Sequence, residues 1–488
     1  METRHSAVGI IAIATLSNAL VSYDAAVVGV ALPKIDSRLS IPIASGGWVS
    51  GAMLLVIGAT VVPAGRLSGR YGPRIVLFWG TLIIMLGTVL AAIAQEAAML
   101  LAGRAIQGLG SSALLAAGMM IVGVCFEPDR RSTVFGISVG LSAVMFVAGP
   151  VVGGLLTDGP GWRAIFVTEL PVAIVLLLTI VIWAPKKASV VDPLTPKHGL
   201  DIGGAVLLAI ATTGVAFAAT QFGATASLTP VIIVSFIVGI GAGVVFVRFE
   251  SRDRFPMVPV RDVWRNLELR SLLFYMLILR LALVGPATYL VLYFELGLGE
   301  SATAAGLSLL PALLPAFIAA PLAGYLSDRL GYAPILLASA VLVVCGLATG
   351  AAAIGTSSRS LMVAGLILFG LGIASSVSPN TAACLNAVHA SELGMVSGLS
   401  RMVSQFGGLL GLAVFGALIG GVEAIVAGVN QVVPPQAIAP LDPSEKTGLD
   451  DGLIVAMTLL ALAVVWVTVI MWRHRDEVTP EPAIDPVS

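Results

Sequence analysis

The chain has 488 residues, of which 58% are hydrophobic and only 11% are charged, and its net charge is −1. A soluble domain has about 25% charged residues, so this composition excludes a water-soluble fold. The net charge by itself says nothing about a nucleic-acid partner, because in a membrane protein the loops that hold the charges matter, and we expect no such partner. The apolar runs are continuous and roughly twenty residues long, which predicts membrane-spanning helices and not the alternating strands of a β-barrel.

Fourteen apolar runs are long enough to cross a membrane as helices. The first carries Asp24 and is too long for a cleaved signal peptide. In chain order the runs lie near 8–32, 46–65, 75–94, 98–126, 133–157, 163–184, 199–221, 228–248, 269–296, 302–324, 334–353, 360–384, 395–422 and 452–472. The stretch 249–268 between two of them is typical of a short interfacial helix, and the outer loop 423–451 is expected to be irregular.

The positive charges indicate the orientation of the chain. With fourteen spans and an inside amino terminus, most of the 26 lysines and arginines lie in loops on the cytoplasmic side. This distribution follows the positive-inside rule, and an odd number of spans would destroy it. Both termini are therefore expected in the cytoplasm.

A short polar loop occurs twice. GRLSGRYGPR at 65–74 and GYLSDRLGYA at 324–333 each lie between the second and third spans of a six-span half. Duplicated halves related by an axis normal to the membrane are typical of one large class of transporters. The expected domains are a first bundle at 1–185, two inserted helices with a cytoplasmic loop at 186–268, a second bundle at 269–472 and a tail at 473–488.

Six motifs in chain order carry a resemblance to the major facilitator superfamily and, within it, to the fourteen-helix drug:proton antiporters. The loop at 65–74 is similar to G-x-L-a-D-r-x-G-r-[KR], and LAGRAIQGLGSS contains R-x-x-Q-G-x-G. The motif segments are 22–35, 65–74, 101–112, 140–156, 161–166 and 394–414.

This resemblance implies an all-α integral membrane protein of fourteen spans, with two six-helix bundles, two inserted helices and both termini cytoplasmic. It implies export of small hydrophobic or amphipathic drugs in exchange for protons, by a monomer in the lipid of a bacterial inner membrane, without a cofactor. Two alternatives remain open: an exporter dedicated to one native product, such as a self-made antibiotic, siderophore or lipid, and a membrane receptor that no longer transports.

The resemblance also implies which residues move the halves. Gly69 stands where the family has an aspartate that latches the cytoplasmic side, so Asp328 in the second copy is expected to carry more of that work. Gly149 and Pro150 in the antiporter motif indicate a kinked or tightly packed seam between the halves, for which ordinary small-residue packing is the alternative. The candidate gating residues are Gly65, Gly69, Arg70, Gly72, Arg74, Asp328, Arg329, Gly149, Pro150, Gly153 and Gly154.

One acid inside the first span is the main candidate for proton coupling. An unpaired charge within a bilayer costs a few kcal/mol, so Asp24 is expected to have a charged partner or a function. Arg104 in the fourth span is the expected partner. Burial favours the protonated acid and the arginine favours the ionised acid, so movement between them would switch protonation. Glu169 joins this group because it occupies a position where the related antiporters have asparagine. A structural helix–helix hydrogen bond is the alternative for Asp24, and a purely structural role is the alternative for Arg104.

Six further residues are candidates for a substrate cavity, although each also fits packing, lipid contact or, for Glu295, the wetted outer boundary. They are Gln107, Glu295, Arg280, Tyr289, Tyr293 and Met145. Arg401 is expected at an interface or gate. The histidines and cysteines show no metal spacing, and the absence of a Walker motif and of a catalytic constellation argues against an ATPase or another enzyme.

Overall fold

The structure is a computed structural model that describes residues 2–39, 48–185, 201–225, 229–252, 258, 260–294, 298–300, 302–427 and 443–473. All regular elements of these residues are helical, and none is a strand, which confirms the all-α prediction. Each of the fourteen predicted apolar runs coincides with one helix or, near 163–184 and 302–324, with a series of shorter helices.

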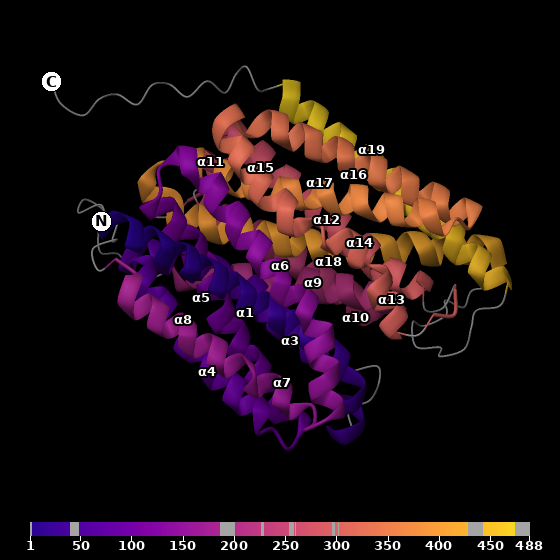
Figure 1. The fold of residues 1–488 in the computed structure, drawn as a ribbon, viewed down its shortest axis with the longest axis horizontal. Helices are drawn as coiled ribbons and strands as arrows, with labels where there is room; N and C mark the ends of the chain where they lie inside the picture. Colours follow the sequence, from indigo (N-terminus) through magenta and orange to yellow (C-terminus); the bar gives the residue numbers. More distant parts are fainter. Residues whose placement is uncertain are drawn as a thin grey trace.

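The helices form two halves with an inserted pair between them (Figure 1). The first half comprises α1 (Glu2–Leu39), α3 (Trp48–Tyr71), α4 (Pro73–Ala92), α5 (Ala97–Cys125), α6 (Pro128–Asp158), α7 (Arg163–Val167) and α8 (Glu169–Trp183). The insert comprises α9 (Ile202–Thr225) and α10 (Pro230–Glu250), and the short α11 (Val260–Arg265) follows. The second half comprises α12 (Leu267–Leu292), α13 (Ala302–Ser308), α14 (Leu310–Leu313), α15 (Ala316–Leu330), α16 (Tyr332–Thr356), α17 (Arg359–Asn386), η2 (Ala390–Glu392), α18 (Leu393–Ala427) and α19 (Pro443–Arg473).

Twelve stretches of the described helices are long and apolar enough to cross a membrane. Helix α9 contributes a shorter apolar stretch, Gly203–Ala218, and α12 is not among the twelve. The protein is therefore a multi-pass membrane protein with about twelve clear candidate spans.

The repeated loop has the same backbone conformation in both copies. Gly72 has φ 86° and precedes α4, while Gly331 has φ 85° and precedes α16. A positive φ at this turn is readily adopted only by glycine. The sequence repeat at 65–74 and 324–333 therefore encodes one tight helix–helix turn used twice.

The two halves pack together at the end of the molecule where α1 begins and α19 ends, which we call the closed end (Figure 1). Helix α3 lies against α18, and α6 lies against α15. A Cβ atom at Gly65 would collide with the backbone of Gly394, and one at Gly324 would collide with the backbone of Ser132. These glycines thus allow backbone-to-backbone packing between the halves.

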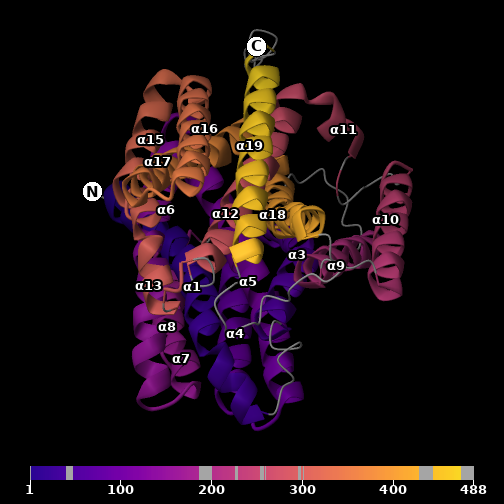
Figure 2. The ribbon, with the colours of Figure 1, turned by 90° about the vertical axis from the view of Figure 1, so that its right-hand side faces the viewer.

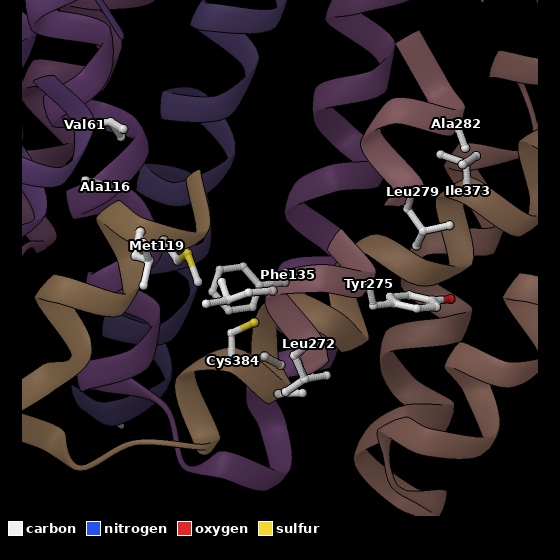
Figure 3. Packing of buried hydrophobic residues seen from close by; sticks show 14 of the residues in the cluster. Val61, Ala116, Met119, Phe135, Leu272, Tyr275, Leu279, Ala282, Ile373 and Cys384 are labelled. Atoms are coloured by element: carbon white, nitrogen blue, oxygen red, sulfur yellow. The ribbon is translucent and has the colours of Figure 1, made fainter. Parts of the chain in front are cut away.

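The hydrophobic core is continuous across this contact. Met119 and Phe135 of the first half belong to the same buried cluster as Leu272 and Cys384 of the second half (Figure 3). Close packing of large side chains resists separation, because each buried side chain that loses its neighbours costs free energy. The conformation in which the halves are packed together at the closed end is therefore well defined.

The inserted helices lie beside the contact between the halves. Helix α9 packs on both α3 and α18, and α10 packs on α9 and projects to the side of the molecule (Figure 2). Gly214 and Gly239 bring the backbones of the two inserted helices together. The insert therefore covers the seam formed by α3 and α18.

The expectation of an irregular outer loop at 423–451 is wrong at both ends. Helix α18 continues to Ala427, and α19 already begins at Pro443, while residues 428–442 lie outside the described residues. Pro443 opens its helix because the first helical position needs no N–H donor, and an acid two residues later suits the positive end of the helix dipole.

Gly65→Ala is expected to weaken the closed end. The added methyl group would force α3 away from α18, at about 1–3 kcal/mol, which corresponds to a population shift of about 5- to 150-fold. The measurement is maleimide labelling of a cysteine placed at Ser397, a buried residue of α18, in a chain without its native cysteines. Gly58→Ala is the matched control, because a Cβ atom there meets no atom within 4 Å. Equal labelling of both variants would contradict the packing argument.

Candidate functional site

The centre of the first half contains a buried ion pair between α1 and α5. Arg104 donates from Nη1 to Oδ1 of Asp24 at 2.5 Å and from Nη2 to Oδ2 at 2.9 Å. Asp24 is 3% exposed and Arg104 is 1% exposed. A bidentate contact between a guanidinium and a carboxylate is the strongest form of such a pair. The charges of Asp24 and Arg104 therefore compensate each other.

A hydrogen-bond network continues from Arg104 to a second carboxyl group. Arg104 donates from Nη1 to Oε1 of Gln107 at 2.9 Å, and Gln107 donates from Nε2 to Oε2 of Glu169 at 2.9 Å. Thr88 donates to the same Oε2 atom at 3.1 Å. We call Asp24, Thr88, Arg104, Gln107 and Glu169 the acid cluster.

Close helix packing brings the members of the acid cluster together. A Cβ atom at Gly87 of α4 would lie 2.6 Å from the backbone nitrogen of Gln107, and one at Gly103 of α5 would lie 2.9 Å from that of Ala91. Because these two glycines let α4 and α5 touch along their backbones, the short Thr88 side chain reaches Gln107.

The acid cluster contains more carboxyl groups than positive charges. Arg104 supplies one positive charge, whereas Asp24 and Glu169 supply two carboxyl groups. A buried uncompensated charge is costly, so the neutral state with one protonated carboxyl group is favoured. Oε1 of Glu169 is buried without a hydrogen-bond partner, whereas both oxygens of Asp24 accept from Arg104.

Apolar and aromatic side chains surround the acid cluster. Tyr23, Val49 and Phe166 belong to one buried cluster, and the Arg104 guanidinium lies 6.0 Å from the centre of the Phe166 ring. Proton exchange with water therefore requires movement of α1 or of the helices around it. The acid cluster thus combines two buried carboxyl groups with one guanidinium, which contacts Asp24 directly and Glu169 through Gln107.

A second polar group lies in a pocket between the halves. The pocket has a free volume of about 50 Å³. Within it Arg280 donates from Nε to Ser404 Oγ at 2.5 Å, and Arg401 donates from Nη2 to Oδ1 of Asn18 on α1 at 3.1 Å. The residues that line the pocket are Met119, Met276, Leu279, Arg280, Leu283, Ile373, Ser376, Val377, Asn380, Thr381, Ser400, Arg401 and Ser404.

Of the six cavity candidates from the sequence, Arg280 lines this pocket. Gln107 lies in the acid cluster instead, and Met145 packs beside the apolar residues that surround that cluster. Tyr289 stacks on Phe415 with ring centres 6.2 Å apart. These side chains lie elsewhere because the helices expose to the pocket only those faces that point toward the other half.

Of the last two candidates, one lies away from the pocket and the other is not described. Tyr293 is 3% exposed and packs beside Phe294, and Glu295 lies outside the described residues. Sequence reasoning did not single out Asn18, which accepts from Arg401, or Asn380, which lines the pocket. Their signal was the presence of a lone amide side chain within an apolar run, where it needs a hydrogen-bond partner.

At the closed end, Asp328 links the halves. Its Oδ1 accepts from the backbone N–H of Ser132 at 3.1 Å, and its Oδ2 accepts from that of Thr133 at 2.7 Å. In the first copy of the loop, a Cβ atom added to Gly69 would lie 3.8 Å from Cα of Gly394. Glycine has no side-chain oxygen, so Gly69 offers no acceptor of this kind. The two copies of the loop thus lie at equivalent positions of the two halves. Only the second copy has a carboxylate, Asp328, at this position.

Three other basic loop residues have contacts within their own half. Arg74 donates to the carbonyl oxygens of Val181 and Ala184 at the end of α8. Arg70 lies over the ring of Tyr71, and Arg329 lies over the ring of Tyr325.

The glycines of α6 divide between two neighbours. Gly140 faces Pro321 of α15, across the contact between the halves. Gly149 and Gly153 instead pack on Ala26 and Val27 of α1 in the same half, so the expected seam between halves does not include them. A Cβ atom at Gly154 would meet no atom within 4 Å, and Pro150 lies within the continuous helix α6.

Comparison with known proteins identifies the family. The sequence profile described as Major Facilitator Superfamily matches residues 14–412. The chain belongs to the Major Facilitator Superfamily. It is accordingly a multi-pass membrane transporter and not an enzyme, as the sequence predicts, and a bacterial plasma membrane is the location consistent with its relatives.

Curated relatives of this superfamily member cover most of both chains. Multidrug resistance protein Stp of Mycobacterium tuberculosis is 27% identical over 82% of this chain and 73% of the relative. The tetracenomycin C resistance and export protein of Streptomyces glaucescens is 26% identical over 82% and 73%. The solved human organic anion transporter MFSD10 has a TM-score of 0.66 at 15% identity, over 96% of this chain and all of that one, which shows a shared fold.

Proposed function

We propose that this transporter exports hydrophobic or amphipathic drugs from the cell in exchange for protons, without a cofactor. The acid cluster is the observation that carries the proposal, because its two carboxyl groups share a single arginine within the membrane. The names of several relatives support the choice of cargo, since they describe multidrug resistance or antibiotic export. A buried site of this kind gains or loses a proton only when its surroundings change, which couples protonation to conformation.

The proposed cycle alternates between two conformations. With the closed end packed, the route to that side is blocked by α3, α18, α6 and α15. Outward opening admits a proton to Glu169, and rearrangement then opens the opposite side. Release of the proton there leaves a net negative charge in the first half, and capture of the next substrate precedes the return to the outward-open conformation.

The orientation proposed for this cycle places the closed end and both termini in the cytoplasm. Helix α6 contacts α15 through Gly136 and Gly140 but contacts α1 through Gly149 and Gly153, so the halves separate toward the outer end. In this orientation the conformation faces outward. We further propose fourteen spans, with α9 and α12 added to the twelve clear candidates, and the domain boundaries expected from the sequence.

Transport by purified protein tests the proposal. Proteoliposomes with an acidic interior and an alkaline exterior mimic the exchange, and ethidium is a suitable fluorescent drug. We expect ethidium accumulation that requires the pH difference and stops when a protonophore collapses it. Ethidium movement of the same rate without any proton gradient would overturn proton coupling.

One relative makes a dedicated exporter the second candidate. The tetracenomycin C relative is named for export of a single antibiotic. A resistance profile of a drug-sensitive host that expresses this chain separates the two functions: protection against many unrelated drugs favours multidrug export, and protection against one compound favours the dedicated exporter.

A further inference from the structure

The pocket between the halves contains two arginines that the acid cluster does not use. Arg280 of α12 and Arg401 of α18 are partly exposed, and both line the pocket. Their positive charges repel each other. Among the described residues, neither guanidinium forms an ion pair with a carboxylate. Two like charges in a largely apolar pocket lack the counter-charge that normally offsets their desolvation.

Polar atoms around the two arginines are also unpartnered. Nε of Arg401 and Oγ of Ser400 are buried without a hydrogen-bond partner, and so is Oδ1 of Asn380. Ser400 is 1% exposed and Asn380 is 2% exposed, so neither can use bulk water. The amide of Asn380 can also present its NH₂ group by rotation. Arg401 Nε and Ser400 Oγ are therefore hydrogen-bond donors without acceptors, and Asn380 adds a third donor when its amide is rotated.

We propose that this pocket binds the anionic head group of an amphipathic compound, such as a sulfonate, a phosphate or a carboxylate. Guanidinium groups bind such oxyanions through paired hydrogen bonds. The free space of about 50 Å³ accommodates a few water molecules, which matches a small head group and not a whole drug. Met276, Leu279 and Leu283 provide apolar surface beside the arginines for the start of a hydrophobic body. This inference rests on the proposed export function and names a class of its substrates.

Anion binding would act directly on the contact between the halves. Arg401 donates to Asn18, which belongs to α1 of the first half, and Asn18 in turn donates to Ser138 of α6. A sulfonate that accepts from Arg401 competes with the neutral amide oxygen of Asn18, and the charged acceptor is the stronger one. Occupation of the pocket therefore releases one link between the halves and favours their movement.

Equilibrium binding of radiolabelled taurocholate tests the inference, because this permanently charged sulfonate has an apolar steroid body. Binding is measured on the purified full chain in neutral detergent, with no gradient. We expect Arg280→Gln and Arg401→Gln each to weaken taurocholate binding at least about tenfold, since hydrogen bonds to charged groups contribute about 1.5–3 kcal/mol. Glutamine keeps a hydrogen-bond donor and removes the repulsion, so these variants are expected to remain folded.

Two comparisons make the result specific. Arg359→Gln is the matched control, because its side chain is 83% exposed, and it should leave taurocholate binding unchanged. Tetraphenylphosphonium, a permanent cation of similar apolar character, should bind the Arg280→Gln and Arg401→Gln variants at least as tightly as the unchanged chain. Equal losses for the anion and the cation, or no taurocholate binding by the unchanged chain, would overturn the anion site.

A lipid arm identifies the natural source of the anion. Nanodiscs of phosphatidylglycerol are compared with nanodiscs of phosphatidylcholine in taurocholate competition. Loss of taurocholate binding only in phosphatidylglycerol, overcome by a higher taurocholate concentration, assigns the pocket to a lipid phosphate; equal binding in both assigns it to free amphipathic anions. Either result supports the site.

The outcome separates this inference from the proposed function. If ethidium export persists but taurocholate does not bind, the anion site fails and proton-coupled export stands. If taurocholate binds in an arginine-dependent manner but no drug moves with the pH gradient, export fails and the anion site stands.

Discussion

Asp24→Asn is expected to abolish gradient-driven drug export and to lower the thermal stability of the protein. The substitution removes the charge that balances Arg104, which is 1% exposed. Loss of one partner from a buried ion pair costs about 3–5 kcal/mol, because the other charge remains buried and unpaired. Thermal unfolding in detergent and ethidium transport in proteoliposomes measure the two effects.

A double variant separates the structural effect from the transport effect. Asp24→Asn combined with Arg104→Gln removes both charges, and replacement of a whole buried pair by neutral groups is often neutral for stability. We expect the melting temperature to recover while export remains absent. Recovery of export in this double variant would show that the pair serves only the fold.

Glu169→Gln provides the matched comparison within the same network. Glutamine has the shape of a protonated glutamate and can still accept from Gln107 and Thr88. We expect unchanged stability, loss of proton coupling and loss of the proton release that accompanies drug binding, measured with a pH dye in weakly buffered detergent. A variant with normal proton release would show that the exchangeable proton lies elsewhere.

Asp328→Ala is expected to shift the protein away from the conformation with the packed closed end. The carboxylate accepts two backbone N–H bonds at the start of α6, and hydrogen bonds to a charged group contribute about 1.5–3 kcal/mol, or a roughly 10- to 150-fold change in population. Spin labels at the exposed residues Tyr71 and Leu330 report the separation of the halves. An unchanged distance distribution would contradict a latch at Asp328.

Gly69→Asp should compensate for that loss. By the equivalence of the two loop copies, an aspartate there would meet the start of α18 as Asp328 meets the start of α6. A built Cβ atom at Gly69 has only one neighbour, Cα of Gly394 at 3.8 Å, so the side chain has room. We expect the combination with Asp328→Ala to restore the closed population and Gly69→Asp alone to slow turnover by over-stabilising it.

The sequence predicted the helices well because their signal is local. Each apolar run of about twenty residues must form its own backbone hydrogen bonds in lipid, so hydropathy alone locates it. The pairing of Asp24 with Arg104 followed from the same physics, since a lone charge in an apolar span requires a partner. Expectations that depended on such local costs agree with the structure.

The rest depended on which helix faces meet, and a single sequence does not contain that information. Arg401 was expected at an interface or gate, and it does contact Asn18 of the first half, but its place beside Arg280 was not expected and follows because α12 and α18 are neighbours in the second half. Gly149 was expected between the halves, yet α6 turns that part of its surface toward α1. Both outcomes depend on the angle at which the two halves meet.

The pairing of two carboxyl groups with one cation has an electrical consequence. If one proton enters for each neutral molecule that leaves, every turnover carries one elementary charge inward, and an inside-negative voltage of 100 mV adds about 2.3 kcal/mol of driving force. If the departing molecule is a monovalent anion, two charges move and the same voltage contributes about 4.6 kcal/mol. Efflux would then continue in alkaline surroundings, where voltage is the only remaining source of energy.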